Sequence, residues 1–458
     1  MKDLTSGNIY KTFFLFAIPL VLSALLSQTY NLLDTVIAGK FLGDSGIAAI
    51  GATSAFMDFF SGPFWGCSAG FSILVARLFG AKDFQRMKNT IRSNLTVMIA
   101  IMGFFCALCL IFADRILAFL KVDPSIYAQA KSYYLLYVAG LPLIILTNSN
   151  VHITNALGMS GFPLKMSVVS AVLNLSGNLL SVLIFKAGVA GIAFSSVFAA
   201  LVVDICYFFK IRRCYKELAL PKEPFRVSWR TVKSSLSYAV PTMAQQFAMY
   251  LSSFLVSPLV NGISGGATAA YAVALKLYAL SAAIYQNANK TLSTYTAQSV
   301  GAQKFGQLRR GVRVGWLQTN LFLLPPLVLC VIFAEPICRL FFPAGFSGEG
   351  LEYAVLFVKY YLPFVVFNLI NNLFHGFYRG VAAMRLLLTV TFLGAAARVL
   401  LSFLLQPAWG IRGIYLALVL SWVIEAVITT VLYASGRWKN RLIAEYRLDP
   451  DKKEEIFR

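Results

Sequence analysis

Residues 30–51 read YNLLDTVIAGKFLGDSGIAAIG, and this stretch places the acidic residue Asp34 inside an apolar segment that is long enough to span a membrane. A carboxylate in the hydrocarbon of a bilayer is costly, so it normally faces an internal cavity or a partner and marks a transport or proton path. The stretch therefore predicts a membrane helix that carries a functional acid. The rest of the chain is then expected to supply the helices around it.

The composition is that of a membrane protein. The 458 residues are 58% apolar and 13% charged, and the mean hydropathy is +0.71, far from the average of soluble domains. Apolar runs near the roughly 20-residue spanning length recur along the chain, which predicts about twelve helices. The runs lack the alternation of a barrel strand, so we expect an all-α membrane protein. The predicted spans begin near Thr12, Ile47, Leu95, Tyr133, Met166, Ala190, Ser237, Ala267, Val314, Val355, Leu386 and Ile414.

The net charge of +21 reflects membrane orientation rather than nucleic-acid binding, because the basic residues gather in alternate connections. This positive-inside bias predicts that both termini are cytoplasmic. No small-residue cleavage site follows the first apolar run, so we expect that helix to be retained as a signal anchor. The basic residues on the predicted inner side include Lys82, Arg86, Lys88, Arg92, Lys210, Arg212, Arg213, Lys216, Arg230, Lys233, Lys304, Arg309, Arg310 and Arg313.

The chain repeats itself at a nearly constant offset of 221 to 222 residues. The matched pairs are Gly80 with Gly301, Ala81 with Ala302, Phe84 with Phe305, Arg92 with Arg313, Pro19 with Pro241, and Gly191 with Gly413. Each half then holds six helices, and an even number makes the two halves parallel repeats with a substrate path between them. We expect an N-terminal lobe over 1–209, a cytoplasmic linker over 210–236, a C-terminal lobe over 237–436 and a cytoplasmic tail over 437–458.

Two predicted helices carry candidate cavity residues. The second helix has Asp58 one turn before a glycine stripe, and a nearby hydroxyl or backbone group is an equally good explanation of this acid. On the eighth helix, Lys276, Asn287 and Lys290 share one face at 100° per residue. Tyr278, Tyr285 and Gln286 lie nearby. We favour a cavity-facing stripe over lysines that reach toward the membrane surface.

These segments together resemble the multidrug and toxic compound extrusion (MATE) transporters of the MOP flippase superfamily, most closely the DinF-like bacterial branch. The resemblance covers essentially the whole chain. It implies the MATE fold of two pseudo-symmetric six-helix lobes in the bacterial cytoplasmic membrane. It also implies export of small amphipathic molecules by alternating access, and we expect a monomer without cofactor or metal. The segments that carry it are YNLLDTVIAGKFLG, VLNLSGNLL, GVAGIAFSSVFA, SVGAQKFGQ, FYRGVAAMR, GIRGIYLALVLSW and GRWKN.

The resemblance also implies a cation site in the N-terminal lobe. Its positions correspond to Asp34, Asn174, Asn178 and Ser196. Relatives of this branch have a second acid where Asn178 stands, so one carboxylate remains here. Hard cations prefer several charged oxygen ligands, whereas a proton needs only one acceptor, so we expect H⁺ rather than Na⁺ coupling.

Other ionisable residues have structural explanations. We expect His375 and His152 to serve packing or hydrogen bonding, and Arg398 to pair with Glu425 within the C-terminal lobe. For Asp204, near the inner end of the sixth helix, we expect an ion pair or an interfacial position. The acids that the NorM branch places on helices seven and ten are absent, with Gln245 and Gln246 in the relevant part of helix seven.

Enzymatic readings fit poorly. The sequence GCSAG around Ser68 matches GxSxG, but it lies within a predicted membrane helix without the strand-to-helix turn of a hydrolase. There is no P-loop to bind ATP. Cys106 and Cys109 match CxxC within an apolar run, where helix packing is expected rather than redox or metal chemistry.

Two questions on the substrate stay open. A flippase for a lipid or lipid-linked precursor is the alternative to a drug exporter. The charges also divide between the lobes, with Asp34 and Asp58 in the first and Lys276, Lys290 and Arg398 in the second, which predicts an anionic or zwitterionic substrate at the second. The alternative is that Asp58 and Lys276 neutralise each other.

Overall fold

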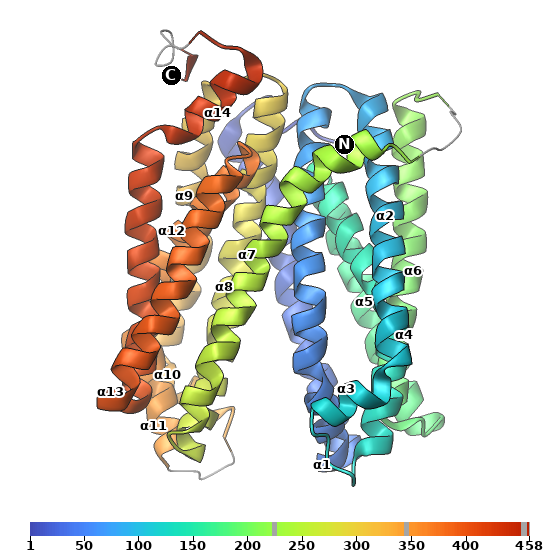
Figure 1. Cartoon of the computed structure of the whole chain (residues 1–458), viewed down its shortest axis with the longest axis vertical. Coiled ribbons are helices and arrows are strands. Elements are labelled where there is room, and N and C mark those ends of the chain that lie inside the picture. Colours follow the sequence, from blue (N-terminus) through green and yellow to red (C-terminus); the bar gives the residue numbers. More distant parts are fainter. Residues whose placement is uncertain (222–226, 343–347, 450–455, 458) are drawn as a thin grey trace. The chain divides into compact units, whose positions relative to one another are not determined.

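The computed structural model describes residues 1–221, 227–342, 348–449 and 456–457, and it describes no side chain at 30–36, 38–40, 44, 47, 54 and 55. Within these limits every regular element is helical, which agrees with the predicted all-α class (Figure 1). The elements are α1 (Ile9–Gly80), α2 (Phe84–Ile111), α3 (Ala113–Phe119), α4 (Tyr127–Ala156), α5 (Gly161–Leu179), the π-helix η1 (Leu180–Ile184), α6 (Gly188–Glu217), α7 (Trp229–Asn261), α8 (Gly265–Gly301), α9 (Gln307–Ile332), α10 (Ala334–Arg339), α11 (Glu349–Leu356), η2 (Phe357–Tyr361), η3 (Leu362–Phe364), α12 (Val365–Gly380), α13 (Met384–Ala434) and α14 (Arg437–Tyr446).

Glycines break the two longest helices. Gly43 in α1 has φ 69° and Gly410 in α13 has φ 54°, a left-handed region that only glycine enters at little cost. Ten segments of the described chain are long and apolar enough to cross a membrane. The break at Gly410 divides one of these ten in two, and α7 is a further helix of 33 residues that is not among the ten. The described chain thus has twelve long helical segments, six in each half, as the sequence predicts.

The chain forms two compact units, and their boundaries fall inside α1 and α7. Unit 1 contains Met1–Asp3 and Leu22–Met243, and unit 2 contains Leu4–Val21 and Ala244–Arg458. The first helix of each half, α1 or α7, therefore contributes to both units. The lobe boundaries predicted from the sequence are defined by the repeat, whereas the two units are defined by which residues pack together.

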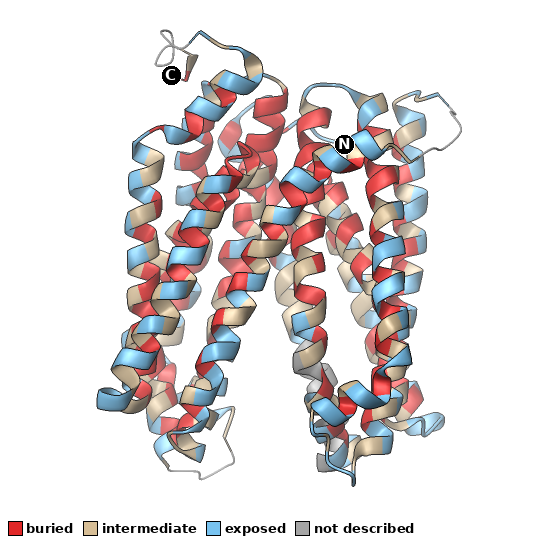
Figure 2. Cartoon of the chain, viewed as in Figure 1, coloured by how far each residue is buried: buried red, intermediate tan, exposed pale blue. Residues whose placement is uncertain are grey.

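The core of unit 1 is built from aromatic, methionine and cysteine side chains of α1, α2 and α4. Tyr134 is fully buried in it beside Phe64 and Met102. Cys106 and Cys109 of α2 belong to the same cluster, which confirms their predicted packing role. Exposed positions recur along α2 between the buried ones (Figure 2), as expected for a helix with one face toward lipid.

Two glycines allow helices of unit 1 to approach closely. A Cβ on Gly140 of α4 would lie 2.0 Å from Val197 of α6, and a Cβ on Gly70 of α1 would lie 2.5 Å from the Cα of Ala239 of α7. Gly70 belongs to the predicted small-residue stripe. Small residues at such contacts let membrane helices gain packing contacts between their backbones.

The N-terminal segment is held to unit 2 by specific contacts. Leu4 donates its backbone N–H to Oε1 of Gln298 at 2.9 Å, and Gln318 donates its side-chain amide to the Phe13 carbonyl at 2.9 Å. The ring of Phe13 also packs edge-on against Tyr295, with centroids 4.9 Å apart. These buried contacts explain why Leu4–Val21 clusters with the second half of the chain.

Candidate functional site

Asp34, the predicted coupling acid, lies in α1, and its side chain is outside the described residues. Its predicted neighbours are described, and they belong to α5 and α6 of unit 1.

Asn174, Asn178 and Ser196 form one buried chain of hydrogen bonds. The Asn178 amide donates to Oδ1 of Asn174 at 3.1 Å, and the Asn174 amide donates to Oγ of Ser196 at 2.9 Å. Both asparagines are nearly inaccessible, at 4% and 0% exposure. The i, i+4 spacing on α5 aligns the two amides, because residues four apart share one face of a helix. The structure thus brings together three of the four predicted site residues.

A π-helical turn follows this chain directly. The segment Leu180–Ile184 continues α5 from the residues next to Asn178. Within it, Ser181 lies 3.4 Å from Ser195, the neighbour of Ser196 on α6. Single π-turns inside helices are frequent at functional sites because they redirect side chains. The polar stripe therefore extends over two turns along the contact of α5 with α6.

Asp204 of α6 has an amide partner rather than the expected cation. It is buried, and Asn150 of α4 donates to its Oδ1 at 3.0 Å. Among the described residues no ion pair to this carboxylate is present. Of the two expected explanations, the ion pair is therefore wrong, the interfacial position stays a prediction, and α4 supplies a neutral donor inside the unit.

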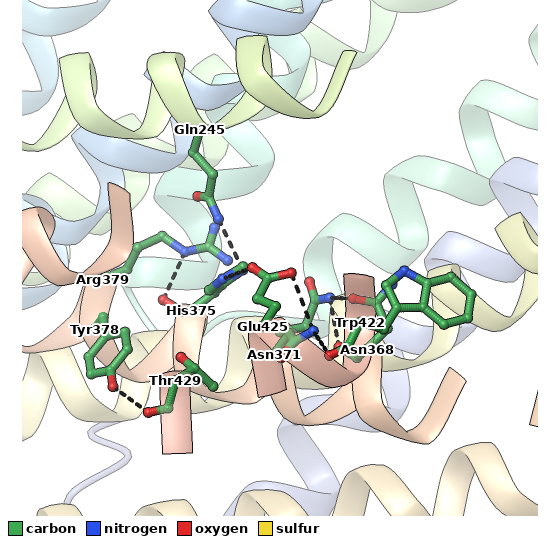
Figure 3. A network of polar contacts seen from close by, with 10 residues as sticks. Gln245, Asn368, Asn371, His375, Tyr378, Arg379, Trp422, Glu425 and Thr429 are labelled. Atoms are coloured by element: carbon green, nitrogen blue, oxygen red, sulfur yellow. Dashed lines mark hydrogen bonds and ion pairs between the residues drawn. The ribbon is translucent and has the colours of Figure 1, made fainter. Parts of the chain in front are cut away.

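Unit 2 contains a buried network around His375 and Glu425 (Figure 3). Nε2 of His375 lies 3.0 Å from Oε1 of Glu425, although the ring N–H is poorly aligned for a hydrogen bond, so the contact is mainly electrostatic. The Gln245 amide nitrogen lies 3.1 Å from Nδ1 of His375. Asn371 donates to Oε2 of Glu425 at 3.3 Å and to the Trp422 carbonyl at 3.0 Å. Side chains of α7, α12 and α13 thus come together around His375 and Glu425.

The expected pair of Arg398 with Glu425 is wrong. The Arg398 guanidinium donates to the hydroxyls of Ser252 and Ser253 on α7 and of Tyr271 on α8, at 3.3, 3.0 and 3.1 Å. Glu425 instead lies beside His375, and the contact of that histidine with the Gln245 amide confirms its expected hydrogen-bonding role.

Two predicted cavity tyrosines form a rigid polar cluster with Asn368. Tyr285 donates to Tyr278 at 3.1 Å, and the Asn368 amide donates to both hydroxyls, at 2.7 and 3.1 Å. Tyr278 also stacks on Trp422, with centroids 5.3 Å apart. Tyr285 is fully buried and Tyr278 is partly buried, so Tyr285 supports Tyr278 from inside the unit.

The predicted lysines occupy different surroundings. Lys276 is exposed, and its ammonium lies 5.9 Å from the ring centroid of Phe341. Lys290 of α8 is partly buried, and so is Arg379 of α12, the helix that packs against α8. In the described part of the chain neither Lys290 nor Arg379 has an acidic partner. Arg379 donates its Nε–H to the His375 carbonyl at 3.2 Å.

The remaining cavity candidates are less constrained. Gln286 is exposed and Asn287 is partly buried, donating to the Ala283 carbonyl at 2.7 Å. Asp58 is an exposed residue of unit 1. Lys276 belongs to unit 2, so mutual neutralisation of Asp58 and Lys276 stays a prediction.

Sequence reasoning missed the network on α12. Asn368, Asn371 and His375 follow one another at i, i+3 and i+7, which places them on one helix face and is the signal that could have found them. Nothing in the sequence indicates that this face meets Glu425, 50 residues further along the chain.

The sequence pattern of the MatE family matches residues 19–180 and again residues 241–404, so the match itself repeats once in each half. The chain belongs to the MatE family. Together with the membrane-spanning helices, this makes it a multi-pass membrane transport protein rather than an enzyme.

Two named relatives match this MatE-family chain over most of its length. It is 25% identical over 345 residues to the probable multidrug resistance protein YoeA of Bacillus subtilis, covering 73% of this chain and 74% of that protein. It is 21% identical to YpnP, a second probable multidrug resistance protein of B. subtilis, over 95% and 97%.

Solved structures confirm the fold. A MOP superfamily transporter from Pyrococcus furiosus Vc1 superposes with a TM-score of 0.88 at 16% identity, covering 96% of this chain and 98% of that one. A MATE family multidrug resistance transporter in an outward-facing conformation gives 0.86 at 16% identity, over 98% and 99%. The expected MATE fold is therefore confirmed.

Proposed function

We propose that this MatE-family protein is a secondary active antiporter that exports small amphipathic molecules across the cytoplasmic membrane, coupled to H⁺. Family membership and the multidrug resistance names of its relatives support export. The buried chain of Asn178, Asn174 and Ser196 carries the choice of ion, because all three groups are neutral.

Asp34 is proposed as the residue that binds the proton, with that chain ordering its hydrogen bonds. One carboxylate surrounded by amides and a hydroxyl suits a proton better than Na⁺, which prefers several charged oxygens. Protonation removes a charge from a low-dielectric interior, so the helices around it can favour a different packing in each state. That difference would let a proton gradient drive alternating access.

Unit 2 supplies a second group that could exchange a proton. Glu425 and His375 are buried together, and the acid also accepts from Asn371. Intramembrane ionisable residues of this kind often belong to proton paths. Asp34 remains our primary assignment because it belongs to the cation site that the family resemblance implies.

The substrate is proposed to carry a negative group. Lys290 of α8 and Arg379 of α12 are two partly buried cations close to each other, and the described residues offer them no acid. Like charges held together at reduced dielectric favour an anion between them, because their interaction energies grow several-fold over those in water. Lys276 is the third proposed contact. The partly buried Tyr278 and Asn287 and the exposed Gln286 are proposed to contact the rest of the molecule.

Transport by the purified protein in liposomes tests the proposed function. Ethidium and carboxyfluorescein serve as cationic and anionic probes, with pH and Na⁺ gradients imposed separately. We expect accumulation driven by the pH gradient and not by Na⁺, with the anionic probe preferred. Movement of a fluorescent phospholipid between leaflets without transport of either dye would instead favour the flippase alternative.

Both termini are proposed to be cytoplasmic and the protein monomeric.

Substitution of the two cations tests the substrate charge. Lys290→Ala and Arg379→Ala should each weaken carboxyfluorescein binding, whereas Arg385→Ala, which removes an exposed arginine at the start of α13, should leave it unchanged. At about 1.5–3 kcal/mol for a hydrogen bond to a charged group, each loss corresponds to roughly 10- to 150-fold. Unchanged anion binding in both variants contradicts the proposed substrate class.

A further inference from the structure

A pocket on unit 2 has the chemistry of a membrane-lipid site and is separate from the residues proposed for transport. It has a volume of about 500 Å³ and is formed by α9, α12, α13 and α14. These four helices are labelled in Figure 1. We define the basic pocket by its lining residues Arg309, Arg313, Trp316, Phe374, Tyr433 and Trp438.

Two of the three basic residues that line the pocket lie on one face of α9, and the third is Lys439 of α14. Arg309, Arg313 and Trp316 are spaced i, i+4 and i+7, so their side chains lie along one side of the helix. Both arginines are exposed, and they line the pocket together with Tyr433 of α13. A guanidinium presents several N–H donors in a plane, a geometry that matches phosphate oxygens.

The opposite wall is aromatic and held in place by its own contacts. The rings of Tyr433 and Trp438 stack at an interplanar angle of 9°, and Trp438 donates to the Tyr433 carbonyl at 3.2 Å. Gly436 makes the turn between α13 and α14 at φ 66°, which brings Trp438 back beside α13. Tryptophan and tyrosine are enriched where a membrane protein meets lipid headgroups, because they combine an apolar ring with a polar group.

The helices beyond the pocket expose apolar side chains suited to acyl chains. On α9, Leu317 and Leu321 continue the row of Arg313 at i+4 and i+8, and they are 46% and 58% exposed. On α13, Val427 and Val431 are 57% and 60% exposed. A water-facing surface would not favour such rows, whereas lipid covers them without cost. The arginines thus lie at the end of a lipid-facing surface.

We propose that the basic pocket binds an anionic phospholipid, with Arg309 and Arg313 contacting the phosphate and the acyl chains lying along the exposed rows of α9 and α13. Charge complementarity selects an anionic headgroup, and basic pockets between membrane helices bind such headgroups in general. The proposal requires a membrane protein but not a particular transported substrate. Its test therefore succeeds or fails independently of the proposed export activity.

Native mass spectrometry of the purified full-length protein tests the site, with phosphatidylglycerol and phosphatidylcholine added in equal amounts. We expect preferential retention of phosphatidylglycerol. Arg309→Gln and Arg313→Gln should each weaken its binding about five-fold, at roughly 1 kcal/mol for each basic residue near a membrane surface. The matched control is Arg310→Gln, because Arg310 is exposed on the same helix but does not line the pocket.

Three results would overturn the proposal. These are equal retention of the two lipids, equal effects of the three arginine-to-glutamine substitutions, and displacement of the lipid by glycerophosphate at the same concentration, which would indicate a soluble phosphate site. A fourth contradicting result comes from a further variant. A fourth variant, Arg313→Lys, checks that any loss reflects charge. It should retain more phosphatidylglycerol than Arg313→Gln, and equal loss in both also contradicts the assignment.

Discussion

At the residue scale, the neutral side chain of Asn178 determines which ion the proposed cation site would favour. Its amide is fully buried and donates a hydrogen bond to Asn174, whose own amide donates to Ser196. A neutral side chain here removes the second carboxylate that the family resemblance leads one to expect. The site should therefore lack the charge needed to strip water from Na⁺.

Substituting Asn178→Asp should add Na⁺ sensitivity to transport. The new carboxylate replaces an amide of nearly the same shape, so the fold should tolerate it once a cation is bound. We expect probe accumulation driven by a Na⁺ gradient in this variant and not in the wild type. Asn148→Asp on α4 is the control, because it adds an acid to the same unit at a position outside the hydrogen-bonded chain. Na⁺-driven transport in the control as well would disprove a specific site.

The contact of Glu425 with His375 should stabilise unit 2 measurably. Each is nearly buried, so removing one leaves the other without its charged partner, at about 1–3 kcal/mol. His375→Gln and Glu425→Gln should both lower the thermal midpoint, and the double variant should lose less than their sum. His152→Gln, at the other of the two histidines in the chain, is the control. Strict additivity would show that the two side chains do not interact.

At the element scale, close helix packing depends on missing side chains. Gly140 lets α4 approach α6, the helix that carries Ser196, and the same helix pair also holds Asp204 through Asn150. The position of α6 against α4 therefore bears on the geometry of the polar chain between α5 and α6.

Gly140→Ala should destabilise the protein by about 1–3 kcal/mol, because the added methyl group would overlap the side chain of Val197. Val197→Ala in the same protein should restore most of the thermal midpoint. Gly103→Ala on α2, where no atom lies within 4 Å of the added carbon, is the matched control and should be neutral or stabilising. Failure of Val197→Ala to rescue the variant would contradict a steric cause.

At the scale of the whole molecule, the sequence repeat predicted the twelve helices but not how they are shared. Matching positions such as Pro19 and Pro241 locate the halves, whereas packing decides the units. The contact of Phe13 with Tyr295 and that of Gly70 with Ala239 join residues more than 160 positions apart, which no local pattern reveals.

The candidate site shows the same limit. Asn174 and Asn178 could be aligned from their spacing and the family resemblance. The partner of Glu425 could not, because the sequence offers both His375 of α12 and Arg398, on the other side of the Gly410 break in α13, as basic side chains. Only the structure distinguishes them, by placing Arg398 among the hydroxyls of Ser252, Ser253 and Tyr271.

One carboxylate, that of Asp34, is proposed to couple transport to protons. The most direct measurement is pH-gradient-driven uptake of carboxyfluorescein into liposomes that contain either the wild type or Asp34→Asn. We expect the variant to fold and to bind the dye but to show no uptake driven by the pH gradient, because its side chain cannot exchange a proton. Uptake by Asp34→Asn at the wild-type rate, in the same gradient, would contradict the account.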